Sequence, residues 1–150
     1  MSVVFVLVSI VLFNAILLFI PKQLTKREMF ATSFFSLTLQ QTVDIYLALK
    51  YNLYGYFGGG VHYITLVAIL GIYPAINLIY LNLFPFCRGI LIKAIYITFW
   101  EFFALFYEWM AVRTGFFYHH GWEYWYSLII NPMLFLILNL ALWVYRKIGD

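Results

Sequence analysis

The most constraining feature of this sequence is that its charged residues are few and are placed so that long apolar stretches contain almost none. Lysine and arginine number 9 and aspartate and glutamate number 6 in 150 residues, which is 10% of the chain, against about 25% in an ordinary soluble domain. Hydrophobic residues make up 65%, and a soluble fold could not cover so much apolar surface with polar groups. The composition therefore predicts a chain that is embedded in lipid.

Five apolar stretches are close to the roughly 20 residues that a helix needs to cross a bilayer. They cover residues 3–20, 29–49, 63–84, 90–110 and 124–145. The first lacks the basic segment and the small-residue cleavage site of a signal peptide, so we expect it to be retained. The fold class that we predict is all-α: a polytopic membrane protein with a single transmembrane domain, residues 1–150, built as a five-helix transmembrane bundle.

The basic residues predict the orientation of this bundle. If the connecting segments alternate between the two sides of the membrane, one side receives Lys50 and Arg113 only. The other side receives all the remaining basic residues, which are Lys22, Lys26, Arg27, Arg88, Lys93, Arg146 and Lys147. Cytoplasmic segments carry the excess of lysine and arginine. We therefore expect the N-terminus outside and the C-terminus in the cytoplasm.

Several classes of function are disfavoured by what the chain contains. Cys87 is the only cysteine, which excludes an internal disulfide and a cysteine-based metal site. The run Gly58–Gly60 lacks the Lys and Ser/Thr of a phosphate-binding loop. The net charge of +3 is explained by topology. We therefore expect no cofactor and no nucleic-acid partner.

The ionisable residues inside the apolar stretches are the candidate functional groups, because such residues usually face the interior of a bundle and mark function. Glu101 and Glu108 are separated by nearly two helical turns, so both project from one face of the fourth stretch. The second stretch carries a polar stripe at helical spacing, made of Ser33, Ser36, Gln40 and Asp44. We expect the second and fourth helices to pack together and hide these faces from lipid.

Two interpretations of these polar groups remain open. They can serve only as packing contacts, with Glu108 paired to Arg113 and Asp44 paired to Lys50. Alternatively they form a ligand-binding site in the outer half of the bilayer, because carboxylates framed by aromatic rings suit a cation. The candidate ligand-binding residues are Asp44, Gln40, Glu101, Glu108, Trp100, Tyr107 and Trp109.

Two adjacent histidines, His119 and His120, are weak candidates for metal ligands. They need further ligands, for which Glu108 or Glu123 would be available, and the zinc-binding pattern H-E-x-x-H is absent. A histidine pair that titrates near neutral pH at the membrane surface is the simpler interpretation. We therefore predict no metal site.

Two segments carry a resemblance to known proteins. Residues 44–57 (DIYLALKYNLYGYF) and residues 107–118 (YEWMAVRTGFFY), followed by Gly121 and Trp122, resemble an uncharacterised family of small multi-span membrane proteins of spore-forming Gram-positive bacteria. The resemblance implies a bacterial plasma-membrane location and supplies no activity or catalytic residues. The Thr114–Tyr118 segment is also similar to one in carotenoid-biosynthesis membrane proteins, although the acidic Pro-x-x-Glu element of the cyclases is missing.

Three functions follow as hypotheses. The first is a binding or assembly component of the membrane, not an enzyme, which holds a lipid-like or cationic amphiphile or contacts a partner membrane protein. The second is an intramembrane enzyme acting on an isoprenoid or lipid, with catalytic residues drawn from Glu101 as acid or base and Glu108 and Asp44 as orienting groups. The third is a small proton-coupled transporter, against which the odd number of helices and the lack of an inverted repeat count. In all three, membrane lipids surround the chain.

Overall fold

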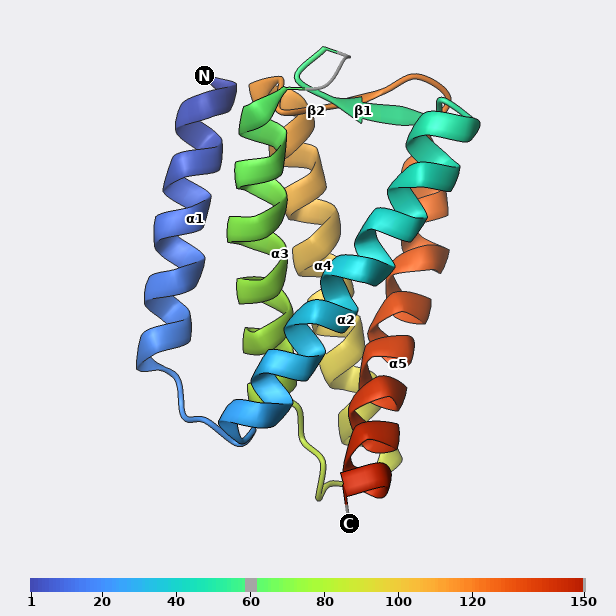
Figure 1. Cartoon of the computed structure of the whole chain (residues 1–150). Coiled ribbons are helices and arrows are strands. Elements are labelled where there is room, and N and C mark those ends of the chain that lie inside the picture. The colour runs from blue at the N-terminus through green and yellow to red at the C-terminus, as the bar shows by residue number, and fades with distance from the viewer. Residues whose placement is uncertain (59–61, 150) are drawn as a thin grey trace.

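A computed structural model describes residues 1–58 and 62–149 of the chain. The five α-helices are α1 Ser2–Phe19, α2 Lys26–Asp44, α3 Tyr63–Leu83, α4 Ile90–Thr114 and α5 Tyr124–Gly149. A π-helical segment, η1 Ile45–Lys50, continues α2, and two short strands, β1 Tyr54–Tyr56 and β2 Phe117–His119, complete the described structure. The chain ends lie at opposite ends of the molecule (Figure 1). The predicted helical class is confirmed, with a small sheet that the sequence analysis did not anticipate.

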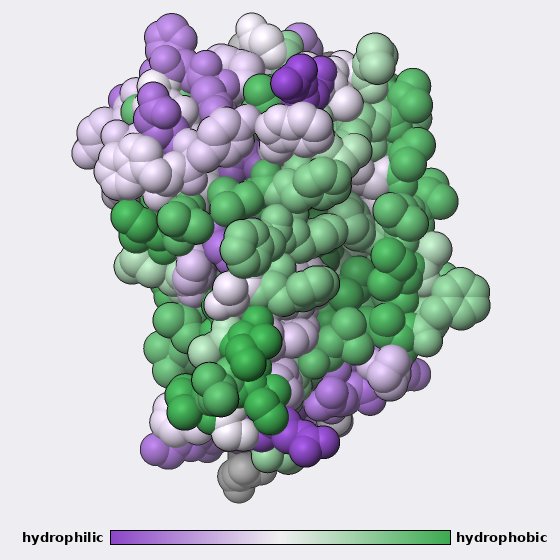
Figure 2. Space-filling view, turned by 180° about the vertical axis from the view of Figure 1, so that it is seen from behind, coloured by the Kyte–Doolittle hydropathy of each residue, from purple (hydrophilic) through white to green (hydrophobic). Residues whose placement is uncertain are grey.

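Four of the helices, α1, α3, α4 and α5, are long and apolar enough to cross a membrane, within the part of the chain that the structure describes. They are consistent with a multi-pass membrane protein. The remaining helix, α2, is more polar because its range contains Lys26, Arg27, Glu28 and Asp44. The face shown in Figure 2 has a broad apolar band between two more hydrophilic ends.

The helices α2, α3, α4 and α5 form the bundle proper, and α1 packs mainly on the outside of α3. The contact of α1 with α3 depends on Gly71, where an added Cβ would lie only 2.9 Å from a carbon of Ile10. There, the Asn14 side chain donates a 3.0 Å hydrogen bond to the carbonyl oxygen of Gly71. The expected packing of the second helix against the fourth is wrong. Instead α2 packs against α3 and α5.

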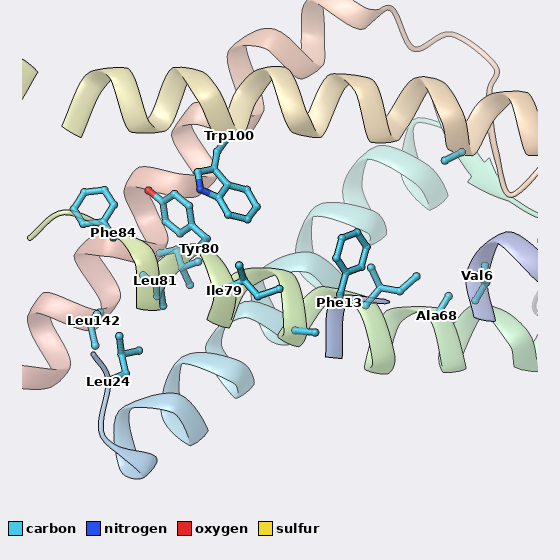
Figure 3. Close-up of a cluster of buried hydrophobic side chains, with 14 of the residues drawn as sticks. Val6, Phe13, Leu24, Ala68, Ile79, Tyr80, Leu81, Phe84, Trp100 and Leu142 are labelled. Carbon is cyan, nitrogen blue, oxygen red and sulfur yellow. The ribbon is translucent and has the colours of Figure 1, made fainter. Parts of the chain in front are cut away.

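The core is aromatic where α3, α4 and α5 meet (Figure 3). The ring of Tyr80, which is fully buried, stacks on Phe135 with centroids 4.8 Å apart and meets Trp100 edge-on at 5.6 Å. Such ring pairs stabilise a core by about 0.5–1.5 kcal/mol beyond the area that they bury. This cluster closes the bundle on the side of the C-terminal end.

The connection between α1 and α2 is fixed by one buried side chain, Asn82 near the end of α3. Its Oδ1 accepts hydrogen bonds from the backbone N–H groups of Gln23 and Leu24, at 2.9 and 3.1 Å. Its Nδ2 donates to the carbonyl oxygen of Leu78 at 2.8 Å. Asn82 is fully buried, so these partners replace the water that its amide loses.

The start of α2 is held by a capping box and an ion pair. The Thr25 hydroxyl accepts from the Glu28 N–H, and the Glu28 carboxylate accepts from the Thr25 N–H. The same carboxylate pairs with Arg146 near the end of α5. Burial raises the pKa of Glu28, but the hydrogen bonds from Arg146 and Thr25 outweigh it, and the pKa lies below its ordinary value. Glu28 therefore stays ionised and ties α2 to α5.

Replacing Asn82 tests how strongly this end of the bundle depends on one amide. We expect Asn82→Ala to lower the free energy of unfolding by about 2–4 kcal/mol, because two buried N–H groups lose their acceptor and a cavity opens. Thermal or denaturant unfolding in detergent measures the change. Gln23→Ala, which removes an exposed amide from the same connection, is the matched control. Equal stability of the two variants would contradict this role of Asn82.

Candidate ligand-binding cavity

A cavity of about 240 Å³ lies between α2, α3, α4 and α5. An engineered cavity of about 150 Å³ is enough to bind benzene, so this one has room for a small organic group. Its wall toward the C-terminal end of the molecule is largely apolar, with Ile76, Trp100, Leu134, Phe135 and Leu138. Its wall toward the N-terminal end includes side chains from the two strands and the segments beside them, namely Tyr54, Tyr56, Phe116, Phe117 and Trp122.

The small sheet lies across the N-terminal end of the bundle (Figure 1). Its strands are antiparallel, and Tyr54 is opposite His119 while Tyr56 is opposite Phe117. Because side chains alternate along a strand, these four share one face of the sheet. On the other face, the ring of Tyr118 occupies the space where a Cβ on Gly55 would lie. A larger residue at position 55 would require the Tyr118 side chain to move.

Each strand follows a helix that ends in a residue with positive φ. Asn52, at φ 49°, reverses the chain after η1, and Gly115, at φ 75°, reverses it after α4. Glycine adopts this conformation without steric cost, and asparagine adopts it more readily than most residues. Past Gly115, the Phe116 N–H donates to the Ala111 carbonyl at 3.0 Å, as in a Schellman helix end. The two reversals direct both strands back over the cavity.

The carboxyl group of Asp44 is held entirely by neutral donors. Its Oδ1 accepts from the Tyr54 hydroxyl at 2.7 Å and from the Gln40 amide at 3.1 Å. The Tyr56 hydroxyl lies 3.2 Å from its Oδ2 and is also hydrogen-bonded to Tyr73. Asp44 is buried behind these side chains, which themselves line the cavity. Asp44 thereby fixes β1 to the end of α2.

Glu108 lines the cavity directly. Its Oε1 lies 2.9 Å from Nε2 of His119 in a hydrogen bond. The second carboxylate oxygen, Oε2, has no hydrogen-bond partner among the described residues. Since Tyr54 and His119 face each other across the sheet, Asp44 and Glu108 are connected through one cross-strand pair.

Glu101 lies apart from the other two acids. It is 5% exposed and lies between α4 and α5, where the Asn131 side chain reaches its Oε1 at 3.5 Å. Its Oε2 is buried without a hydrogen-bond partner in the described structure. Asn131 lines the cavity, so Glu101 is one side chain removed from it.

The other predicted site residues divide into two groups. Gln40, Trp100 and Tyr107 line the cavity together with Glu108. Trp109 does not, because it is exposed on the outside of α4, where its ring stacks on Phe106.

The local ion pairs considered for Glu108 and Asp44 are wrong. The Arg113 guanidinium lies over the ring of Trp109, because five residues along a helix place it on a different face from Glu108. The Lys50 ammonium lies over the rings of Tyr46 and Tyr51. The packing interpretation therefore loses the two partners that it assumed.

The histidines do not gather further metal ligands. His119 contacts Glu108, and His120 is exposed. No group of three histidine, cysteine, aspartate or glutamate side chains comes together within residues 1–58 and 62–149. Of the glycine run that follows β1, Gly59 and Gly60 lie outside the described residues.

Sequence reasoning missed Tyr54, Tyr56 and Asn131, which contact the acids, and Tyr73, which is hydrogen-bonded to Tyr56. It considered His119 only as a weak metal ligand beside Glu108. The alternation of aromatic side chains and glycine in Tyr54-Gly-Tyr56 was the available signal for a strand. Comparisons with protein-family models, with curated proteins and with solved structures found no match to this chain.

The dependence of the sheet on Asp44 can be measured by hydrogen exchange. The Asp44→Asn substitution removes the negative charge. It also replaces one carboxylate oxygen by an amide NH₂ group, so one of the three hydrogen-bond donors to this side chain loses its acceptor. We expect the amides of residues 54–56 and 117–119 to lose roughly tenfold in protection, because bonds to a charged acceptor are about twice as strong as neutral ones. Glu123→Gln, at an exposed acid near the same end, is the matched control. Unchanged protection in the Asp44 variant would show that the sheet is held by other contacts.

Proposed function

We propose that the chain is an integral plasma-membrane protein whose five helices all cross the bilayer, with the N-terminus outside and the C-terminus in the cytoplasm. The opposite positions of the chain ends support an odd number of crossings. The polarity of α2 does not argue against a crossing, because Ser36 and Gln40 face the cavity. A polar residue in a membrane helix is tolerated when it faces the bundle interior.

For this protein we propose a binding role: it holds an amphiphile with a cationic head group in the cavity. One observation carries the proposal, namely that Glu108 lines an aromatic cavity and that, within the described residues, only its Oε1 is hydrogen-bonded. No lysine or arginine lines that cavity among the described residues. A ligand cation would therefore meet both a carboxylate and the faces of aromatic rings, each cation–π contact contributing about 0.5–2 kcal/mol.

The polarity of the cavity supports an amphiphile. The head group would lie beside Glu108, under the sheet, and the apolar part would extend along Ile76, Leu134 and Leu138. A partner helix would need a space about 10 Å wide along its length, which a cavity of about 240 Å³ cannot provide. The size therefore favours a small ligand inside the bundle over a docked helix.

Matched ligands test the head group. Octylammonium, octyltrimethylammonium, octanol and octyl sulfate share one chain and differ in charge, and calorimetry on the protein in phosphatidylcholine nanodiscs measures their binding. We expect the two cations to bind at least tenfold more tightly than octanol and the sulfate not to bind. In Glu108→Gln this preference should fall by about tenfold or more, because a hydrogen bond to a charged group contributes roughly 1.5–3 kcal/mol.

Glu123→Gln is the control for this experiment, because it removes an acidic residue from the same end of the molecule without touching the cavity. Its cation preference should equal that of the wild type. A loss of equal size in both variants would mean that the surface potential, and not the cavity, selects the cation. Tighter binding of octanol than of the cations would overturn the proposal.

A second candidate function is favoured by the unpartnered Oε2 of Glu101. A buried carboxyl group of this kind suits proton exchange, either in an intramembrane enzyme acting on an isoprenoid or lipid or in a proton-coupled transporter. Glu101→Gln separates the candidates. Under the binding role we expect the affinity for octylammonium to change less than about threefold, because Glu101 does not line the cavity. A loss of proton flux across vesicles in this variant, with ligand affinity retained, would favour the second candidate.

The resemblance to membrane proteins of spore-forming Gram-positive bacteria remains part of the proposal. It supports a bacterial plasma membrane as the location and adds nothing on the ligand. Mass spectrometry of molecules that co-purify with the protein in native lipid would identify the occupant directly.

A further inference from the structure

A second hollow lies at the opposite end of the molecule from the sheet. It is a shallow groove of about 490 Å³ between the first turns of α2 and the end of α5. The residues that line it are few and include both basic and apolar or aromatic side chains, namely Lys26, Arg27, Phe30, Ala31, Phe34 and Tyr145. The groove therefore places two cations next to an apolar, aromatic surface.

The cations of this groove differ from their neighbours in having no internal partner. Arg146 pairs with Glu28, and the Lys147 ammonium lies over the ring of Trp143. Lys22 donates to backbone carbonyl oxygens at the end of α1. In the described structure, neither Lys26 nor Arg27 has a hydrogen-bonded side chain or an ion pair.

The nearest acid cannot neutralise them. Glu28 lies one turn or less from both in the sequence, but its carboxylate already accepts from Arg146 and from the Thr25 N–H. Two positive charges are therefore left uncompensated at the mouth of the groove. An anion is the complementary ligand.

The rest of the groove requires that the anion carry an apolar part. Phe30 and Phe34 are one helical turn apart, their ring centroids are 4.8 Å apart, and both are largely exposed. A soluble anion would leave these rings uncovered, whereas a phospholipid acyl chain would lie along them. Basic pockets between helices at the membrane surface commonly bind anionic head groups in this way.

We propose that this groove, made of the six lining residues above, is a binding site for an anionic phospholipid. Lys26 and Arg27 contact the phosphate and the acyl chain covers Phe30 and Phe34. The proposal rests on the membrane position proposed above, but it does not depend on the ligand of the cavity. The two sites lie at opposite ends of the bundle and share no lining residue.

Native mass spectrometry of the full chain, released from detergent with added phosphatidylglycerol, phosphatidylcholine or inorganic phosphate, tests this site. We expect the wild type to retain phosphatidylglycerol at least tenfold better than phosphatidylcholine. In the double variant K26Q/R27Q we expect that preference to fall by about tenfold to thirtyfold, because two cations that attract anionic lipid at the membrane surface are lost. The matched control is R88Q/K93Q, which removes two positive charges from the same end of the molecule but from outside the groove.

Each outcome decides the proposal. An equal loss in both double variants would overturn it in favour of diffuse surface charge. Retention of inorganic phosphate as strong as that of phosphatidylglycerol would overturn the lipid as occupant, and a concentration-dependent dimer that K26Q/R27Q abolishes would assign the groove to a second copy. Binding of octylammonium should be unchanged in K26Q/R27Q, while Glu108→Gln should leave lipid retention unchanged. Failure of one site is therefore distinguishable from failure of the other.

Discussion

A carboxyl group in an apolar surrounding costs several kcal/mol unless its oxygens accept hydrogen bonds, and this constraint organises the molecule. Asp44 sits at the end of α2, where its own helix supplies one donor, the Gln40 amide. The other hydrogen-bond donors to its carboxylate are Tyr54 and Tyr56, which come from the segment that follows η1. Bringing them to Asp44 folds that segment across the end of the bundle. The sheet, and with it one wall of the cavity, therefore depends on satisfying one buried acid.

The same requirement is met differently at each of the three acids that the sequence singles out. Asp44 receives neutral hydroxyl and amide donors, Glu108 receives a histidine on one oxygen, and Glu101 receives only a long contact from Asn131. The hydrogen bonding of the carboxyl oxygens becomes less complete in that order. It is least complete at Glu101, which is buried between α4 and α5, and this inequality separates a group that holds structure from groups that remain available for a ligand or a proton.

The two ends of the molecule use charge in opposite ways. At the C-terminal end, Asn82 and the Glu28–Arg146 pair fix the backbone, while the side chains of Lys26 and Arg27 have no partner among the described residues. At the N-terminal end, aromatic hydroxyls and one histidine surround acids, and the cations Lys50 and Arg113 lie on aromatic rings away from them. The first arrangement suits an anion at a membrane surface, and the second suits a cation inside the bundle.

Hydropathy and the spacing of charges were enough, by themselves, to predict a helical chain with long apolar helices, because burial in lipid is a local property of each stretch. They also singled out Asp44, Glu101 and Glu108, since any acid inside such a stretch is anomalous. Which helices are neighbours was decided only by the tertiary structure, and so were the partners of those acids. Tyr54 and His119 belong to segments far apart in the sequence, and only the reversals at Asn52 and Gly115 bring them over one cavity. Whether a buried acid finds hydrogen-bond partners depends on the assembled bundle, so no single stretch of sequence could specify those partners.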